Sequence, residues 1–267
     1  MSSKHNLSVS SPIHRFSYNG FPVHMKQYGT CRSTLPLVFI GGAFQNIRQI
    51  EKLSNAFAQK TWVIAVDTPG NGDTGVLPHS YPFEFICTAI NHCLVNELGV
   101  DRINLLGCSY GSIIAMRYAQ MFPNIERLVL GAAMDHLPER LEYEFSRLLF
   151  LLKWNKRQEF ADGFTDLMTN PELRETNRLC KITGEKLRHA LMHSNDGITE
   201  QFIHNTKRIL KDPGTDLSLM PDIETTVFTG EHDSFVPVEE NKRVAAAFKR
   251  NKFVALPNAD HMFHVEQ

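Results

Sequence analysis

This sequence has no excess of positive or negative charge, few cysteines and no long apolar run. The 28 lysine and arginine residues are balanced by 29 aspartate and glutamate residues, for a formal net charge of −1 at pH 7. This balance, without any basic block, gives no electrostatic support for binding nucleic acid or a membrane surface. No segment approaches the roughly 18 uninterrupted apolar residues that a membrane-spanning helix needs. We therefore expect neither nucleic acid nor a membrane as a partner.

The cysteines are odd in number and irregularly spaced, which argues against both a disulfide framework and a zinc site. The N-terminal segment, Met1 to Pro12, is polar and rich in serine, so it lacks the apolar run of a secretory signal. Together these features predict a cytoplasmic protein with buried thiols. The cysteines are Cys31, Cys87, Cys93, Cys108 and Cys180.

What the sequence does contain is a serine in a strand–turn–helix setting. The apolar run Ile103 to Leu106 leads into Gly107-Cys108-Ser109-Tyr110-Gly111, and an apolar helix follows. This is the G-x-S-x-G pattern of a nucleophile elbow, a tight turn that exposes the serine hydroxyl. Glycines are needed on both sides because strand and helix approach closely there. Cys108 is expected to be only a small buried residue of the turn.

Strand and helix patterns alternate along most of the chain, which predicts a mostly parallel sheet with helices on both faces. The chain opens with a hairpin turning at Asn19-Gly20. Asn46 is a plausible N-cap, with Gln49 completing a capping box. The expected strands are 13–18, 21–28, 35–40, 62–66, 103–106, 127–130, 225–229 and 253–256, and the expected helices are 47–58, 82–97, one ending near 122, and 238–248.

The alternation stops between Asp135 and Leu219, where the sequence is charged and helical in propensity. The length of 267 residues suits one large α/β domain carrying an insertion. We predict a helical cap over the strand ends. The expected division is a core domain of residues 1–134 and 220–267 and a cap of residues 135–219.

Ser109 needs a base and an orienting acid, because a free serine hydroxyl is a poor nucleophile at neutral pH. Asp233 follows one late strand and His261 follows the next, giving the chain order Ser…Asp…His that this kind of sheet uses. The carboxyl ends of parallel strands share one edge, so the three residues can meet there. Glu231 competes with Asp233, and His264 competes with His261.

The loop after the strand 35–40 should supply part of an oxyanion hole. One donor is expected to be the Tyr110 N–H, and the other the Ala43 N–H within Gly41-Gly42-Ala43. Phe44 and Gln45 follow directly and are expected to face the substrate pocket.

Metal ligands are not clustered in the sequence. His189 and His193 lie four residues apart on an expected helix, with no third ligand at suitable spacing, so we interpret them as solvated helix residues. His232, next to the expected acid, is interpreted as a supporting or surface residue. The dense His-x-His-x-Asp-His cluster of metal-dependent lactone hydrolysis is missing. We expect no metal and no other cofactor.

Four motifs together resemble the α/β-hydrolase fold family, and the resemblance covers nearly all of the chain outside the cap. They are Gly41-Gly42-Ala43, Asp67-Thr68-Pro69-Gly70-Asn71-Gly72, Gly107-Cys108-Ser109-Tyr110-Gly111, and Gly230 to Pro237 followed by His261. Many relatives have histidine where this chain has Gly41, which is expected to leave the oxyanion loop freer. Most relatives also follow the catalytic histidine with a full helix, whereas this sequence stops at Gln267. We expect it either to be truncated or to lack that helix.

The resemblance implies a serine hydrolase that cleaves a small-molecule acyl ester or lactone through an acyl-enzyme. Within the family, serine at the elbow argues against dehalogenases and epoxide hydrolases, which carry aspartate there. The chain is most similar to metal-independent N-acyl-homoserine lactone lactonases, which implies quorum quenching. It is also similar to acyltransferases acting on 3-hydroxyacyl chains, and a thioesterase or a non-catalytic ligand-binding protein are further alternatives. Leu149 and Phe150, in the apolar run Phe145 to Trp154, are expected to contact the acyl chain.

Overall fold

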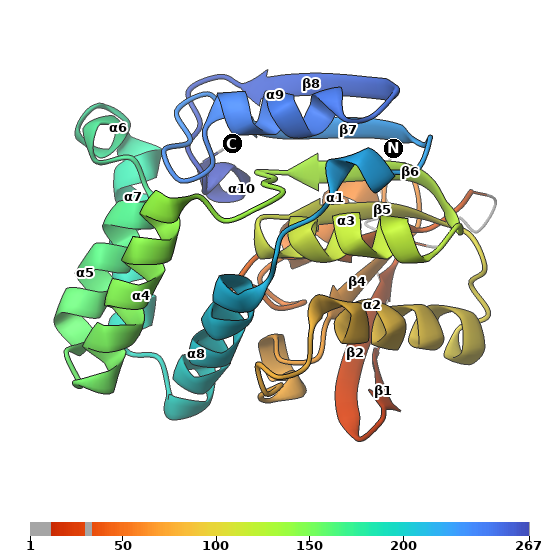
Figure 1. Ribbon diagram of the computed structural model, residues 1–267, viewed down its shortest axis with the longest axis horizontal. Helices are drawn as coiled ribbons and strands as arrows, with labels where there is room; N and C mark the ends of the chain where they lie inside the picture. The colour runs from red at the N-terminus through yellow and green to blue at the C-terminus, as the bar shows by residue number, and fades with distance from the viewer. Residues whose placement is uncertain (1–11, 30–33, 267) are drawn as a thin grey trace, which may run out of the picture.

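An eight-stranded sheet runs through the centre of the protein, with the strand order β1-β2-β4-β3-β5-β6-β7-β8 (Figure 1). The computed structural model describes residues 12–29 and 34–266. The first two strands run antiparallel to each other, β2 also runs antiparallel to β4, and the remaining neighbours are parallel. The strands are β1 (Ile13–Tyr18), β2 (Phe21–Tyr28), β3 (Leu37–Ile40), β4 (Val63–Asp67), β5 (Ile103–Cys108), β6 (Ile125–Gly131), β7 (Glu224–Gly230) and β8 (Arg250–Leu256). The predicted fold class, a mostly parallel α/β sheet, is confirmed.

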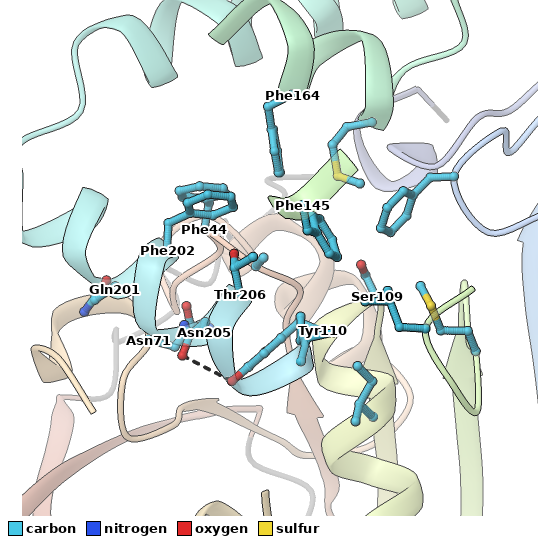
Figure 2. A pocket seen from close by; sticks show the side chains of 17 residues that line it. Phe44, Asn71, Ser109, Tyr110, Phe145, Phe164, Gln201, Phe202, Asn205 and Thr206 are labelled. Carbon is cyan, nitrogen blue, oxygen red and sulfur yellow. Dashed lines mark hydrogen bonds between the residues drawn. The ribbon is translucent and has the colours of Figure 1, made fainter. Parts of the chain in front are cut away.

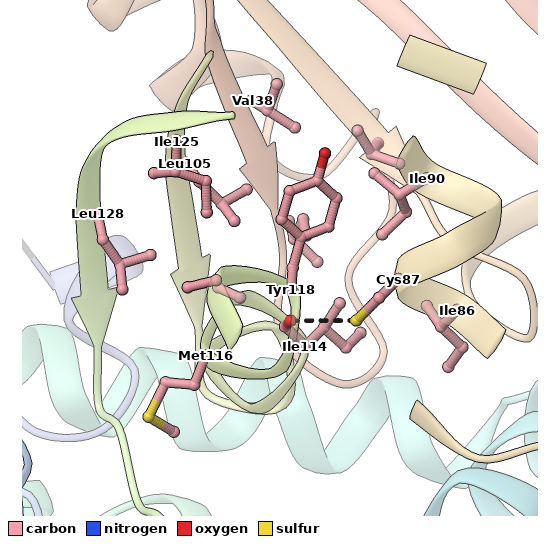
Figure 3. Packing of buried hydrophobic residues seen from close by; sticks show 14 of the residues in the cluster. Val38, Ile86, Cys87, Ile90, Leu105, Ile114, Met116, Tyr118, Ile125 and Leu128 are labelled. Atoms are coloured by element: carbon pink, nitrogen blue, oxygen red, sulfur yellow. Dashed lines mark hydrogen bonds between the residues drawn. The ribbon is translucent and has the colours of Figure 1, made fainter. Parts of the chain in front are cut away.

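Helices cover both faces of the sheet. On one face lie α2 (Phe83–His92), which continues as a π-helical turn over Cys93–Glu97, α3 (Tyr110–Met121) and α9 (Val238–Ala246). Their buried side chains interleave with those of the strands, as Figure 3 shows around Tyr118 and Leu105. The opposite face carries α1 (Glu51–Phe57). Each large apolar side chain buried in this way stabilises the fold by about 1.5–3 kcal/mol.

The first turn predicted for the helix 47–58 is not part of α1. The Asn46 carboxamide accepts from the N–H groups of Arg48 and Gln49, each at 3.1 Å, and the Gln49 side chain accepts from the Asn46 N–H at 2.8 Å. This is the expected capping box, but it caps an isolated turn. The Ile47 N–H donates to the carboxylate of Asp67 at 2.8 Å, so the turn is oriented toward β4 and the regular helix begins only at Glu51.

Five helices lie between β6 and β7 in the chain and gather at one end of the sheet (Figure 1). Their apolar side chains pack on Phe44, Phe235 and Ala259, which lie in loops after β3, β7 and β8. Since these are the carboxyl ends of parallel strands, the helices cover the edge at which α/β proteins bind ligands. They are α4 (Glu139–Lys153), α5 (Arg157–Met168), α6 (Pro171–Thr176), α7 (Arg178–Met192) and α8 (Asp196–Lys211).

Arg208, a buried residue of α8, connects this helix to the core through hydrogen bonds. Arg208 is only 2% exposed, and no carboxylate among the described residues lies within ion-pair distance of it. Its guanidinium instead donates to backbone carbonyls of the segment before α2 and to two side chains. The contacts are Tyr81 O at 2.7 Å, Leu77 O at 2.9 Å, Pro78 O at 3.1 Å, the Tyr110 hydroxyl at 3.0 Å and Asn205 Oδ1 at 2.6 Å.

Three of the cysteines, Cys87, Cys93 and Cys108, carry free thiols, and Cys31 lies outside the described residues. Burial raises the pKa of the Cys108 thiol to about 12, so this neighbour of Ser109 stays protonated.

The described helices include none that is both long and apolar enough to cross a bilayer.

Candidate active site

Ser109 occupies a strained turn between β5 and α3. Its φ is 52° and its ψ is −117°, a combination that costs a non-glycine residue on the order of 1–3 kcal/mol. A Cβ on Gly107 would lie 2.2 Å from the Gly111 carbonyl oxygen, and one on Gly111 would lie 2.4 Å from the Ile40 carbonyl oxygen. Both glycines are therefore required by the backbone contacts that hold the turn. The Ser109 N–H donates to Gly131 O at 2.8 Å, which ties the turn to the end of β6.

His261 lies between Ser109 and Asp233. Its Nε2 is 3.0 Å from Ser109 Oγ, and its Nδ1 is 2.9 Å from Asp233 Oδ2. A carboxylate only accepts hydrogen bonds, so Nδ1 carries the proton and Nε2 is left to accept from the serine hydroxyl. The fold thus brings together the serine, acid and histidine that the sequence suggested, from the ends of β5, β7 and β8.

Three further hydrogen bonds hold the Asp233 carboxylate. Thr229, on β7, donates its hydroxyl to Oδ2 at 2.8 Å. The Phe235 and Val236 N–H groups donate to Oδ1 at 3.0 and 2.7 Å. The Phe235 ring also lies edge-on to the His261 imidazole, with centroids 4.8 Å apart. These contacts orient the acid and the histidine together.

The competing acid and histidines lie elsewhere. Glu231 is exposed and accepts from the Asn258 N–H at 3.2 Å, while His232 is exposed and 3.9 Å from Glu231. The His264 ring contacts Gln45 instead of Ser109 or Asp233.

Asp260 is a buried carboxylate beside His261 that the sequence reasoning did not single out. One oxygen accepts from the His261 N–H at 2.6 Å, and the other accepts from the Asn170 N–H. Asn170 is the N-cap of α6, and its side chain also donates to His232 O at 3.2 Å. The inserted helices are thereby tied to the loops that carry the acid and the histidine. The sequence did contain a signal for Asp260, because this acid directly precedes His261, the expected base.

The two predicted oxyanion donors are available. Within the described residues, the Ala43 and Tyr110 N–H groups donate to no protein acceptor, and both residues line the cavities next to Ser109. Tyr110 is the first residue of α3, so its N–H also lies at the positive end of the helix dipole. The next loop residue, Phe44, has a φ of 62°, which bends the chain away after Ala43.

Gln45 restrains the oxyanion loop, which is formed by Gly41, Gly42 and Ala43. Its Oε1 accepts from the Gly42 N–H at 2.7 Å, and its Nε2 lies 2.6 Å from His264 Nε2. A Cβ on Gly41 would come within 3.0 Å of the same Oε1, so the glutamine occupies space that a side chain at position 41 would need. The expectation that Gly41 leaves the loop freer is therefore corrected, because Gln45 restrains it. Burial lowers the pKa of His264 to about 4, which keeps the ring neutral and able to accept from the amide.

Two cavities meet at Ser109. The inner one extends under α8 and is mainly apolar, with several aromatic side chains; Figure 2 shows Phe44 stacked on Phe202, with Phe145 and Phe164 nearby. The outer one runs between α1 and α7 and includes His261 and Gln45 in its wall. Phe44 therefore lines both cavities and Gln45 the outer one. The residues shared by the two cavities are Ala43, Phe44, Ser109, Phe164 and Met168.

Leu149 and Phe150 line neither cavity. In α4 the residues facing inward are Leu141, Phe145, Leu148 and Leu151. Phe150 falls on the opposite face, where it is 56% exposed and packs against Trp154. Leu149 is half-buried among the inserted helices. The expectation that Leu149 and Phe150 face the pocket is therefore wrong, and the α4 residue that lines the inner cavity is Phe145, one helical turn before Leu149.

Metal ligands are not grouped in the part of the chain that the structure describes, which contains no set of three or more His, Cys, Asp or Glu side chains able to hold an ion. His189 and His193 are both exposed, with ring centroids 4.2 Å apart.

The sheet order, the strained serine and the helical insertion define an α/β-hydrolase fold. Residues 36–180 match the profile of the α/β hydrolase fold family, which is more than half of the chain. The chain belongs to this family.

Two curated relatives match parts of the chain. A soluble epoxide hydrolase from Corynebacterium sp. (strain C12) is 29% identical over 135 residues, covering 49% of this chain and 44% of that protein. A poly(3-hydroxyalkanoate) depolymerase from Ectopseudomonas oleovorans is 28% identical over 98 residues, covering 36% and 34%. The matched segments thus span less than half of either relative.

Solved structures resemble the fold along almost its whole length. MGS-M2, an α/β hydrolase from a Medee basin deep-sea metagenome library, superposes with a TM-score of 0.82 at 19% identity, covering 94% and 92% of the two chains. A thermophilic esterase from Thermogutta terrifontis gives 0.79 at 20%, covering 96% and 94%. Est816, an N-acyl homoserine lactone degrading enzyme, gives 0.76 at 18%, covering 95% of each chain. At these identities the likeness concerns the fold.

Proposed function

We propose that this protein is a serine hydrolase that cleaves carboxylic esters or lactones through an acyl-enzyme. The observation that carries the proposal is the hydrogen-bonded line from Ser109 Oγ through the His261 ring to Asp233, with distances of 3.0 and 2.9 Å. Serine rather than aspartate at the elbow favours ester chemistry over the epoxide opening named for one relative.

In the proposed reaction Ser109 Oγ attacks the carbonyl carbon while His261 Nε2 takes the serine proton. The oxyanion forms at the Ala43 and Tyr110 N–H groups, and such donors typically contribute about 3–4 kcal/mol each to the transition state. The carbon–oxygen bond then breaks, and the leaving oxygen takes the proton from Nε2. Water attacks the acyl-enzyme by the same steps in reverse, which releases the carboxylic acid and restores the serine.

The two cavities suggest how the substrate lies. The leaving oxygen must come within hydrogen-bond reach of His261 Nε2 to be protonated. His261 lines the outer cavity and is not among the residues of the inner one. We therefore assign the leaving group to the outer cavity and the acyl chain to the inner, aromatic one. Medium acyl chains should be favoured over acetyl, with each buried methylene worth up to about 0.8 kcal/mol.

N-acyl-homoserine lactones are our specific candidate substrate, since they combine an acyl chain with a lactone leaving group that remains attached after ring opening. The structural likeness to the N-acyl homoserine lactone degrading enzyme Est816 supports trying them first.

Activity-based labelling tests the proposed function directly. We expect a fluorophosphonate probe to label the protein at Ser109, as read by mass spectrometry. We also expect turnover of p-nitrophenyl hexanoate in a panel that includes p-nitrophenyl acetate, acyl-homoserine lactones and acyl thioesters. A protein that is neither labelled nor active on any member of this panel would instead be a ligand-binding member of the family.

Replacement of Gln45 by leucine should slow the reaction without abolishing substrate binding. The change removes the acceptor of the Gly42 N–H and the contact with His264, so the loop carrying the Ala43 N–H loses its restraint. Small displacements of catalytic groups can cost up to about 100-fold in rate, and we expect kcat to fall by about 10- to 100-fold. The KM for p-nitrophenyl hexanoate should change less than about threefold, because the interaction lost acts mainly in the transition state.

Gln120→Leu is the matched control, because Gln120 also donates to a backbone carbonyl, Asp216 O at 2.8 Å, but lies on α3 away from both cavities. Its kcat should equal that of the unmodified protein. An unchanged kcat in Gln45→Leu would show that the loop is held without the glutamine.

A further inference from the structure

The wall of the inner cavity includes polar side-chain atoms that make no hydrogen bond with any described residue. Thr206 is 2% exposed, and its hydroxyl makes no hydrogen bond with any described residue. The same holds for the side-chain nitrogen of Asn71, which is 5% exposed. Both residues line the cavity.

Gln201 adds an unpaired acceptor. Its Nε2 donates to the Gly72 and Gly75 carbonyls at 2.9 and 2.8 Å. Because a carbonyl can only accept, these contacts fix the orientation of the carboxamide. Its Oε1 is left without a partner among the described residues, in a side chain 9% exposed that lines the cavity.

The neighbouring Asn205 is different, because its carboxamide is fully used. Its Nδ2 donates to Gly70 O at 2.9 Å, and its Oδ1 accepts from Tyr110 and Arg208. Polarity alone is therefore not the unusual feature of this end of the cavity. The unpaired groups come from α8 and from the loop after β4. In Figure 2, Gln201 and Asn71 lie on the left, and Thr206 lies near the centre, between them and Ser109 on the right.

Polar groups that line a cavity beside a nucleophile and make no hydrogen bond within the described protein are free to pair with a bound molecule. Asn71 offers a donor, Gln201 an acceptor, and the Thr206 hydroxyl can do both. A hydroxyl group on the ligand matches this set because it donates and accepts. A keto oxygen would leave the Gln201 acceptor unpaired.

We propose that the inner cavity recognises acyl groups that carry a hydroxyl on the chain, with Thr206, Asn71 and Gln201 as the binding residues. This inference rests on the proposed ester hydrolysis and names the class of acyl group. The three side chains set specificity along the acyl chain and take no part in the bond changes at Ser109.

A set of three p-nitrophenyl esters tests the proposal: the hexanoate, the 3-hydroxyhexanoate and the 6-hydroxyhexanoate. All share a leaving group, so differences report the acyl cavity. For the unmodified protein we expect at least one of the two hydroxylated esters to have a kcat/KM about tenfold higher than the hexanoate. This tenfold ratio corresponds to about 1.4 kcal/mol. Thr206→Val keeps the shape and removes the hydroxyl, and it should reduce this ratio to about 1–3.

Thr88→Val is the matched control, since Thr88 lies on α2 and donates to Glu84 O at 2.7 Å, remote from the cavity. It should leave the ratio unchanged. Equal kcat/KM for all three esters in the unmodified protein would overturn the inference while leaving the hydrolase function intact, and this comparison does not depend on whether a variant folds. A ratio that persists in folded Thr206→Val would overturn the role of Thr206. If no ester is cleaved and no fluorophosphonate label appears, the proposed function itself fails.

Discussion

Replacing Ser109 by alanine should lower kcat on p-nitrophenyl hexanoate by at least about 10⁴-fold and abolish fluorophosphonate labelling. Ser109 supplies the attacking oxygen, and its hydroxyl lies 3.0 Å from His261 Nε2, the proposed base. Removing any one member of such a triad leaves only the rate enhancement that binding and the oxyanion hole provide.

The same variant should remain folded. Alanine at φ 52° is strained to a similar degree as serine, so the backbone cost of the turn is unchanged. We expect its unfolding free energy to lie within about 1 kcal/mol of the unmodified value in a denaturant titration. Ser54→Ala is the control: Ser54 is buried in α1 and donates to Ile50 O at 2.9 Å, so it can affect stability without affecting kcat. If Ser109→Ala retained a hundredth of the activity, the nucleophile would have to be another residue.

Arg208→Leu should be among the most destabilising single substitutions in the protein. The change removes the donors for the Tyr81, Leu77 and Pro78 carbonyls and for Asn205 Oδ1. Pro78 O keeps the Tyr81 N–H and Asn205 Oδ1 keeps the Tyr110 hydroxyl as donors. The Tyr81 and Leu77 carbonyls are then left without a donor among the described residues, at a cost of about 1–3 kcal/mol each. These two carbonyls predict a loss of about 2–6 kcal/mol in unfolding free energy, which is a large part of the stability of an ordinary domain.

Chemical denaturation monitored by circular dichroism would measure this loss, and weak expression of the variant would itself agree with the expectation. Arg127→Leu is the control, because Arg127 pairs with Glu224 on the surface at 3.0 Å, and exposed ion pairs contribute about 0–1 kcal/mol. Should the two variants prove equally stable, water must be able to reach the carbonyls around position 208 and replace the guanidinium.

Arg208 also links stability to the site. It donates to the hydroxyl of Tyr110, the residue whose N–H is the proposed oxyanion donor, and to Asn205 in the wall of the inner cavity. A milder variant, Arg208→Lys, can keep the charge but cannot reach all five acceptors with one ammonium group.

Much of the fold and the candidate catalytic residues could be predicted from local sequence. The elbow is recognisable because its steric requirement is local: two glycines flank a serine between an apolar strand and an apolar helix. Asp233 and His261 could be selected because each directly follows a strand, and the ends of parallel strands share an edge. The hairpin at Asn19-Gly20 was equally predictable, since it needs left-handed backbone angles, observed as φ values of 49° and 84°.

The surroundings of the site could not be predicted in the same way. In the apolar run Phe145 to Trp154 almost every residue is hydrophobic, so the sequence does not indicate which face of the helix turns inward. The packing of α4 on the core decides it, and Phe150 points outward while Phe145 lines the cavity. The separate roles of His261 and His264 likewise depend on distances of a few ångströms to Ser109 and Gln45.

The sequence by itself determined the fold class and the residues whose chemistry is set by their immediate neighbours: the strained serine, the acid and histidine after late strands, and the glycine loop. Only the tertiary structure decided which side chains shape the cavities. Asn71 is far along the chain from Gln201 and Thr206, which share α8, and the three meet only because α8 crosses the loop after β4. Backbone strain is determined by a few consecutive residues, whereas a binding surface depends on how whole helices and strands pack against one another.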